Sequence, residues 1–116
     1  MSKREDREFV QDIKEAARRI ELYLGEISYR DFLKDLRTQD AVVRNLEIMG
    51  EAAKKISKAL KTEYPDIPWK NLAGVRDRLI HDYFGVNYEI VWIISKEEIP
   101  VILPQIKRIL GNKSDI

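Results

Sequence analysis

The sequence predicts an all-α fold, an up-and-down bundle of four to five main helices. Apolar residues recur at steps of three and four through most of the 116 residues, which is the spacing of one helical face. These stretches end at glycine, proline or a capping side chain, and none reads convincingly as a strand. With 44% hydrophobic residues, the chain can fill one modest core. A single domain is therefore expected over residues 1–111, followed by a short tail over 112–116.

The first third of the chain predicts one long helix and one short helix. Residues 5–24 carry apolar side chains along one face, and Gly25 can end that helix. Ser28 can then cap a short helix over residues 29–36.

The third helix is expected to be the longest. It starts at Thr38 or Asp40, and its apolar spacing continues to Lys61. Gly50 falls in its middle, which indicates close packing against a neighbouring element. The opposite side carries four lysines, which we interpret as a solvated face or, alternatively, as a phosphate-binding stripe. These are Lys54, Lys55, Lys58 and Lys61.

Two prolines, at 65 and 68, then interrupt the pattern, because proline lacks a backbone donor and disfavours helical geometry before it. A fourth helix is expected to begin near Pro68 or Trp69 and to stop at Gly85. The side chains that this helix should turn inward are Leu72, Val75, Leu79 and either Tyr83 or Ile80.

The C-terminal part is expected to be helical as well. Asn87 can cap a segment that runs through Ile94. Residues 90–94 have strand propensity, but a lone strand would have no partner in a helical chain, so we expect helix. The remaining signals, in order, are a capping box at Ser95 and Glu98, a helix over 99–110 and an interruption of that helix at Pro104.

Composition excludes several classes of site and partner. The 21 basic and 20 acidic residues give a formal net charge of +1, so a nucleic-acid or membrane partner would need a local patch. The absence of cysteine excludes disulfides and thiolate ligands, and a single histidine argues against a zinc cluster. No run approaches the roughly 20 apolar residues that span a bilayer. We therefore expect a cytoplasmic protein without a membrane partner.

Residues 76–83 hold the only histidine, beside arginines, carboxylates and a tyrosine, and they are the strongest candidate for chemistry. At about 100° per residue, Asp77 and His81 would share a helical face, so the carboxylate could orient the imidazole. Arg78 is also expected near His81. Arg76 would lie roughly 140° from His81 on a straight helix. The two can converge if the arginine reaches across, if the helix ends near His81, or if a second subunit supplies the same segment, which predicts a symmetric dimer.

These features also have simpler interpretations. A lone histidine at a helix end is more often a cap or a satisfied polar group than a catalyst. Trp69 and Trp92 are interpreted as core or interface anchors rather than base-stacking platforms. The carboxylates show no metal-loop spacing, so no metal is implied.

The order Arg-x4-His-x-Tyr at Arg76, His81 and Tyr83 resembles the motif of the HepT toxins, a branch of the HEPN superfamily of small helical ribonucleases. Asp77 departs from the pattern, because the family often has asparagine there. The resemblance covers most of residues 8–110. Its other segments are RNLEIMGEAAKKI at 44–56, IPW at 67–69, LIHDYFGV at 79–86 and VW at 91–92.

The resemblance implies a homodimeric, metal-independent endoribonuclease with no cofactor. It would be the toxin of a type II/VII-like toxin–antitoxin system, acting on RNA such as tRNA or mRNA, whose 2′-hydroxyl is the nucleophile. By this resemblance His81 is the general acid or base and Arg76 stabilises charge on the phosphate, while Asp77 orients His81. Tyr83 would be the tyrosine that a partner minimal nucleotidyltransferase antitoxin modifies with AMP, which would block RNA.

Two other classes of protein stay open at this point. A noncatalytic helical binding subunit of a nucleotidyltransferase complex would keep the same fold and use Arg76 and His81 only to hold a partner or nucleotide. A purely structural dimerisation module would show neither cleavage nor modification, although it gives no reason for this polar series.

Overall fold

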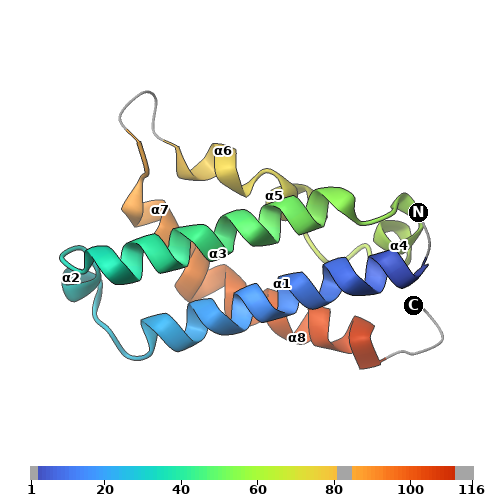
Figure 1. Cartoon of the computed structure of the whole chain (residues 1–116), viewed down its shortest axis with the longest axis horizontal. Helices are drawn as coiled ribbons and strands as arrows, with labels where there is room; N and C mark the ends of the chain where they lie inside the picture. Colours follow the sequence, from blue (N-terminus) through green and yellow to red (C-terminus); the bar gives the residue numbers. More distant parts are fainter. Residues whose placement is uncertain (1–2, 81–84, 112–116) are drawn as a thin grey trace.

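The computed structural model describes residues 3–80 and 85–111, and the regular elements within these residues are all helical. Figure 1 shows α1, α3, the α5–α6 segment and the α7–α8 segment alternating in direction, which confirms the predicted all-α up-and-down bundle. In chain order the elements are α1 (Lys3–Leu24), α2 (Tyr29–Phe32), α3 (Leu36–Lys55), α4 (Lys58–Glu63), α5 (Trp69–Ala73), α6 (Val75–Leu79), α7 (Tyr88–Ile93), the π-turn η1 (Ile94–Glu98) and α8 (Ile99–Gly111).

The long first helix and its end are confirmed. Gly25 follows α1 with φ +48°, a left-handed conformation that glycine adopts without strain. Ser28 caps α2 as expected, because its hydroxyl accepts a hydrogen bond from the backbone N–H of Asp31 at 3.1 Å. The short helix is shorter than predicted, since α2 ends at Phe32, whose side chain is fully buried.

The predicted start of the third helix is wrong by a few residues. Asp35, rather than Thr38 or Asp40, is the cap: its carboxylate accepts from the backbone N–H of Thr38 at 3.1 Å and from the Thr38 hydroxyl at 2.7 Å. The Thr38 hydroxyl and backbone N–H hold the pKa of the Asp35 carboxyl below its usual value. Thr38 is therefore a partner of the cap within the first turn of α3.

The predicted end of that helix, at Lys61, is also wrong. α3 ends at Lys55, and Ile56 is extended with ψ 137°. Ser57 then caps α4 by accepting from the backbone N–H of Leu60 at 3.2 Å. Asp6 of α1 fixes this break, because its buried carboxylate accepts from the Ser57 backbone N–H at 2.9 Å and from its hydroxyl at 2.6 Å.

The fourth helix begins where predicted but forms two short pieces. α5 starts at Trp69, and Gly74 separates it from α6, which ends at Leu79 rather than at Gly85. Gly50 in α3 packs closely against this segment, as expected: a Cβ there would lie 2.8 Å from Val75 Cγ1 and 3.1 Å from the Leu72 carbonyl oxygen. Leu72, Val75 and Leu79 are buried as predicted, whereas Ile80 is exposed and Tyr83 lies outside the described residues.

In the C-terminal part, the predicted cap at Asn87 is confirmed, and the predicted capping box at Ser95 and Glu98 is wrong. The Asn87 side chain accepts from the backbone N–H groups of Glu89 and Ile90. No helix starts at Ser95, since the chain continues helically through Ile94 into η1 and α8. α8 also continues through Pro104 without the predicted interruption. The capping-box prediction failed because two helical segments on either side of Ser95 are joined by a wider turn.

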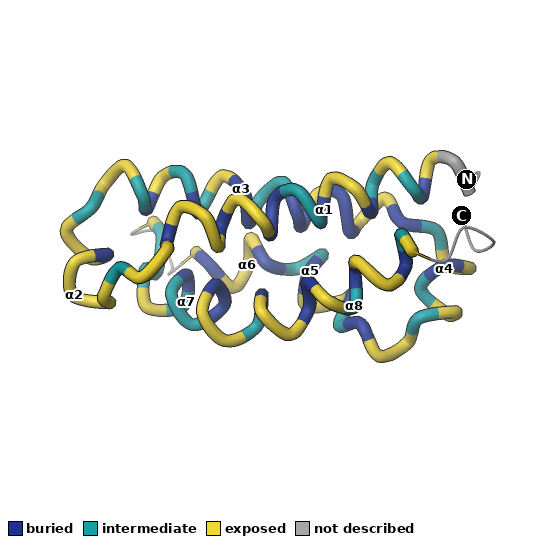
Figure 2. The backbone as a smooth tube through the Cα atoms, turned by 90° about the horizontal axis from the view of Figure 1, so that it is seen from below, coloured by how far each residue is buried: buried dark blue, intermediate teal, exposed yellow. Residues whose placement is uncertain are grey.

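The core lies between these helices, and Figure 2 shows buried residues on their facing sides and exposed residues outside. Trp69 is buried in the core, and the half-buried Trp92 packs its ring against Phe32 with ring centres 5.3 Å apart, so both tryptophans contribute to packing as interpreted. Among the described residues, no helix has the length and apolar character needed to cross a membrane.

Candidate active site

Arg76 is exposed on α6, and its neighbours fix it to the bundle. Val75 and Leu79 on the same short helix are buried in the core. Because Gly50 has no side chain, its backbone in α3 packs closely against Val75, the residue before Arg76. The predicted catalytic arginine therefore projects from a rigidly packed support.

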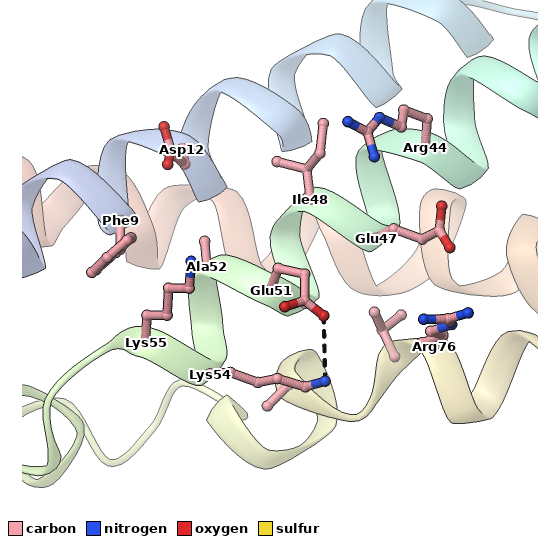
Figure 3. A pocket seen from close by; sticks show the side chains of 13 residues that line it. Phe9, Asp12, Arg44, Glu47, Ile48, Glu51, Ala52, Lys54, Lys55 and Arg76 are labelled. Carbon is pink, nitrogen blue, oxygen red and sulfur yellow. Dashed lines mark hydrogen bonds and ion pairs between the residues drawn. The ribbon is translucent and has the colours of Figure 1, made fainter.

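Arg76 lines a pocket of about 430 Å³. The exposed stripe of α3 forms its floor, α1 contributes one side, and α5 with α6 contributes the other (Figure 3). The lining residues are Phe9, Asp12, Arg44, Glu47, Ile48, Gly50, Glu51, Ala52, Lys54, Lys55, Ala73, Val75 and Arg76. We call this the α3 pocket.

Charged side chains of both signs line the α3 pocket. Lys54 Nζ lies 3.4 Å from Glu51 Oε1, and Lys55 Nζ lies 5.7 Å from the ring centre of Phe9. Arg44 and Arg76 have no carboxylate within ion-pair distance among the residues that the structure describes. Two guanidinium groups in one pocket are thus available for an external anion.

The chain leaves α6 by an abrupt change of direction. Ile80 is extended, with φ −86° and ψ 129°, and pairs with Val86 in an antiparallel bridge. The Asn87 backbone N–H donates to the Leu79 carbonyl at 2.7 Å, and Gly85 has φ +93°. Residues 79–80 and 86–87 are therefore held side by side at the C-terminus of α6.

His81 and Tyr83 lie outside the described residues, so their predicted roles stay predictions. The helical argument for Asp77 and His81 is wrong, because helical geometry ends at Leu79 and Ile80 is extended. Asp77 is exposed on α6, and its supporting role now needs a different geometry. The helix does end just before the histidine, which is one of the three conditions under which Arg76 and His81 could converge, and the convergence itself stays a prediction.

Arg78 forms an ion pair with Glu98 of η1, and its expected nearness to His81 stays a prediction because His81 lies outside the described residues. Its two terminal nitrogens donate to the two carboxylate oxygens of Glu98 at 2.9 and 2.7 Å. This hydrogen-bonded pair raises the pKa of Arg78 and lowers the pKa of Glu98. The pair ties α6 to the π-turn, and sequence inspection missed it because the partners lie 20 residues apart.

Sequence inspection also missed Arg44 as part of the site. The available signal was the recurrence of charged residues along one face of the third helix, at 44, 47, 51 and 54. Within residues 3–80 and 85–111, no group of three or more His, Cys, Asp or Glu side chains is arranged to hold a metal ion.

Comparison with known proteins assigns the chain to a family. A family model described as "Ribonuclease HepT-like" matches residues 13–109. A Thermococcus cleftensis protein named "Probable ribonuclease HepT" is 48% identical over 98 residues, which cover 84% of this chain and 89% of that protein.

Two further relatives carry the name "Putative RNase". One, from Methanocaldococcus jannaschii, is 42% identical over 112 residues, covering 97% of this chain and 93% of the relative. The other, from Caldanaerobacter subterraneus, is 50% identical over 87 residues, covering 75% and 78%. No solved structure matches the chain. Because the family model spans most of the sequence and the relatives align over most of their own length, this chain belongs to the HepT-like ribonuclease family.

Proposed function

We propose that this protein is an endoribonuclease that acts as the toxin of a toxin–antitoxin system. The observation that carries the proposal is the position of Arg76, exposed in a charged pocket on a helix that ends two residues before His81. Family membership adds that relatives of this chain are named as ribonucleases. An exposed guanidinium that has no ion-pair partner among the described residues, five positions before the only histidine of the sequence, suits the cleavage of a phosphodiester.

The proposed reaction uses only groups of the RNA and the protein. The 2′-oxygen attacks the neighbouring phosphorus, the bond from phosphorus to the 5′-oxygen breaks, and a 2′,3′-cyclic phosphate forms. The 2′-hydroxyl gives up its proton and the departing 5′-oxygen gains one. His81 provides one of these transfers, since an imidazole with a pKa of about 6.5 exchanges protons near neutral pH. Arg76 stabilises the charge that develops on the phosphate oxygens.

Asp77 is proposed as a positioning residue that orients His81. It is exposed on the same short helix as Arg76, within reach of the C-terminus of α6. Asp77→Asn should lower kcat and displace the pH profile of cleavage with little effect on KM. Loss of thermal stability with an unchanged pH profile would show a purely structural role instead.

The proposed active form is a homodimer, in which two copies of the Arg76 segment share one RNA cleft. Family membership supports this assembly, and sedimentation of the purified protein tests it. A monomer that cleaves RNA at the full rate would show that the dimer is not required for activity.

Tyr83 is proposed as the site of control. A minimal nucleotidyltransferase antitoxin would transfer AMP to its hydroxyl, and the added anion near Arg76 would repel the RNA phosphate. Mass spectrometry after coexpression with such a partner should show the adduct on Tyr83 and none on a Tyr83→Phe variant. An adduct on another residue, or none, contradicts the proposal.

One assay tests the central claim. Wild-type and His81→Ala proteins are incubated with single-stranded RNA and tRNA in excess chelator, and the product ends are analysed. We expect cleavage with cyclic phosphate ends in the wild type, no cleavage by His81→Ala, and equal helical content in both. Cleavage by His81→Ala at the wild-type rate would exclude His81 from catalysis, and tight binding of a nucleotidyltransferase without cleavage would favour a noncatalytic subunit.

A further inference from the structure

The α3 pocket is larger than the binding of one phosphate by Arg76 requires. Its volume of about 430 Å³ lies within the range of clefts that hold small organic ligands. Figure 3 shows Arg44 and Arg76 toward one end of it, and Phe9 and Lys55 toward the other. The pocket thus extends from the proposed catalytic arginine along the exposed stripe of α3.

Arg44 is the feature that points to a second phosphate. It is exposed on α3 and lines the same pocket as Arg76, and the described residues offer neither guanidinium an ion-pair partner. A guanidinium presents a planar fork that matches phosphate oxygens. Figure 3 shows both arginines at the same end of the pocket with Glu47 beside them, so this end carries two positive charges against one negative charge. Two guanidinium groups suit two neighbouring phosphates of a strand, whereas a single reacting phosphate needs only one.

The other end of the α3 pocket suits a base. Carboxylates repel phosphate but accept hydrogen bonds from the N–H groups of a base edge. Asp12 lines this end, and Glu51 lies between the two ends, 3.4 Å from Lys54 Nζ. Phe9 is half-buried beside them, with the Lys55 ammonium 5.7 Å from its ring centre. Aromatic rings are common stacking platforms for unpaired bases. A base stacked on Phe9 would displace the Lys55 ammonium from the ring and leave it free to pair with the RNA backbone.

Building on the proposed ribonuclease function, we infer that the α3 pocket binds the nucleotide of single-stranded RNA next to the scissile phosphate. Arg44 holds the neighbouring phosphate, and the base of that nucleotide lies toward Phe9, Asp12 and Glu51. The catalytic segment would then act on a strand that α3 has already aligned.

The test compares Arg44→Ala with Arg108→Ala, a matched removal of an exposed arginine on α8 that does not line the pocket. Arg44→Ala should raise KM for a short single-stranded RNA about tenfold or more, because it removes charge-assisted bonds to phosphate. The loss should be smaller on a dinucleoside monophosphate, which lacks the neighbouring phosphate. Arg108→Ala should behave as the wild type does. Equal behaviour of the two variants on the longer RNA would overturn the inference.

A binding experiment separates this inference from the proposed catalysis. The binding constant of a fluorescent single-stranded RNA is measured at several salt concentrations, first with the His81→Ala protein and then with the same protein carrying Arg44→Ala. In a plot of log binding constant against log salt concentration, Arg44→Ala should reduce the slope by about 0.7, the contribution of one phosphate contact. If the wild type never cleaves RNA but this slope changes, the pocket stands and the catalytic proposal fails. An unchanged slope overturns the pocket even if cleavage is observed.

The same variants address the alternative that a second copy of the chain covers the groove. In that case Arg44→Ala would shift the monomer–dimer equilibrium in sedimentation without changing the salt slope for RNA, and that outcome would also overturn the inference. An RNA in which the nucleotide beside the cut is abasic provides an independent check. It should bind the wild type several-fold more weakly than the intact RNA, because the stacking contact is lost.

Discussion

Arg78 and Glu98 form a two-pronged ion pair that joins α6 to the π-turn η1, with nitrogen-to-oxygen distances of 2.9 and 2.7 Å. Their side chains are 35% and 31% exposed, so water screens the pair only in part. Since α6 also carries Arg76, this pair sets the position of the proposed catalytic segment relative to the C-terminal helices.

Replacing Arg78 with alanine should lower both stability and cleavage. We expect a loss of about 1 kcal/mol in the free energy of unfolding, measured by urea denaturation. The kcat of RNA cleavage should fall more than KM rises, because the arginine acts through the position of Arg76. The swapped pair Arg78→Glu with Glu98→Arg should recover part of both losses. Recovery of neither would show that the side chains act independently.

The same pair predicts a dependence of stability on pH. Arg78 lowers the pKa of Glu98 from its usual 4.5, so the folded state favours the ionised carboxylate. This stabilisation is complete above the unfolded pKa and is lost as the pH falls through the lower folded pKa. The stability difference between wild type and Glu98→Gln should therefore be constant near neutral pH and shrink as the pH falls below about 4.5. A difference that grows on acidification would contradict the assignment.

The exposed pair of Glu15 and Arg18 is the matched control for Glu98. Glu15 lies 2.6 Å from Arg18, and hydrogen bonds from Arg18 and Arg19 lower its pKa to about 2. Its side chain is 46% exposed, so solvent screening should remove most of its effect on folding. Glu15→Gln should change stability less than Glu98→Gln does.

Removing the Asp6 carboxylate should destabilise the junction between α3 and α4. Asp6→Ala leaves the half-buried Ser57 backbone N–H without its partner, at a cost of about 1 kcal/mol or more. Urea denaturation measures the loss, and Glu8→Ala, an exposed substitution on the same helix, is the control. Equal stability of the two variants would show that the break at Ile56 does not depend on Asp6.

Replacing Gly50 with alanine should disturb the packing of α3 against α6. Alanine favours helix by about 1 kcal/mol over glycine, but its Cβ would lie 2.8 Å from Val75 Cγ1. Overpacking of this kind costs about 1–3 kcal/mol, so we expect a net loss of stability together with reduced cleavage. Gly111→Ala, where a Cβ has nothing within 4 Å, should be neutral or stabilising. A stabilised Gly50→Ala protein with full activity would contradict the close packing.

Local signals in the sequence predicted local structure well. Gly25, Ser28 and Asn87 each act on residues within four positions, and each ends or begins a helix as expected. The failures come from partners that are distant in sequence. Asp6 accepts a hydrogen bond from Ser57, 51 residues away, at the point where α3 ends. Glu98 pairs with Arg78 instead of capping a helix.

The candidate site was predictable in part for the same reason. Arg76 was identified from a short motif, and the structure places it, exposed, in a charged pocket, while its catalytic role stays a prediction. Arg44 reaches the same pocket only through the packing of α3 against α5 and α6, which a single sequence does not reveal. The helical alignment of Asp77 with His81 failed because an extended residue at Ile80 ends the periodicity on which that argument relied.

The π-turn at Ile94–Glu98 determines which side chains of α8 face the core. Such a turn accommodates one residue more than a regular helical turn does, and each residue of an α-helix accounts for about 100° of rotation. Ser95, whose hydroxyl is buried without a hydrogen-bond partner among the described residues, occupies this wider turn. A regular helical turn over the same residues would rotate every later side chain of α8 by about a quarter of a revolution or more relative to α7, whereas deleting one residue would let the turn close as a regular one and keep that register. The wider turn therefore keeps Ile99 in the interior and Glu98 opposite Arg78 at the same time.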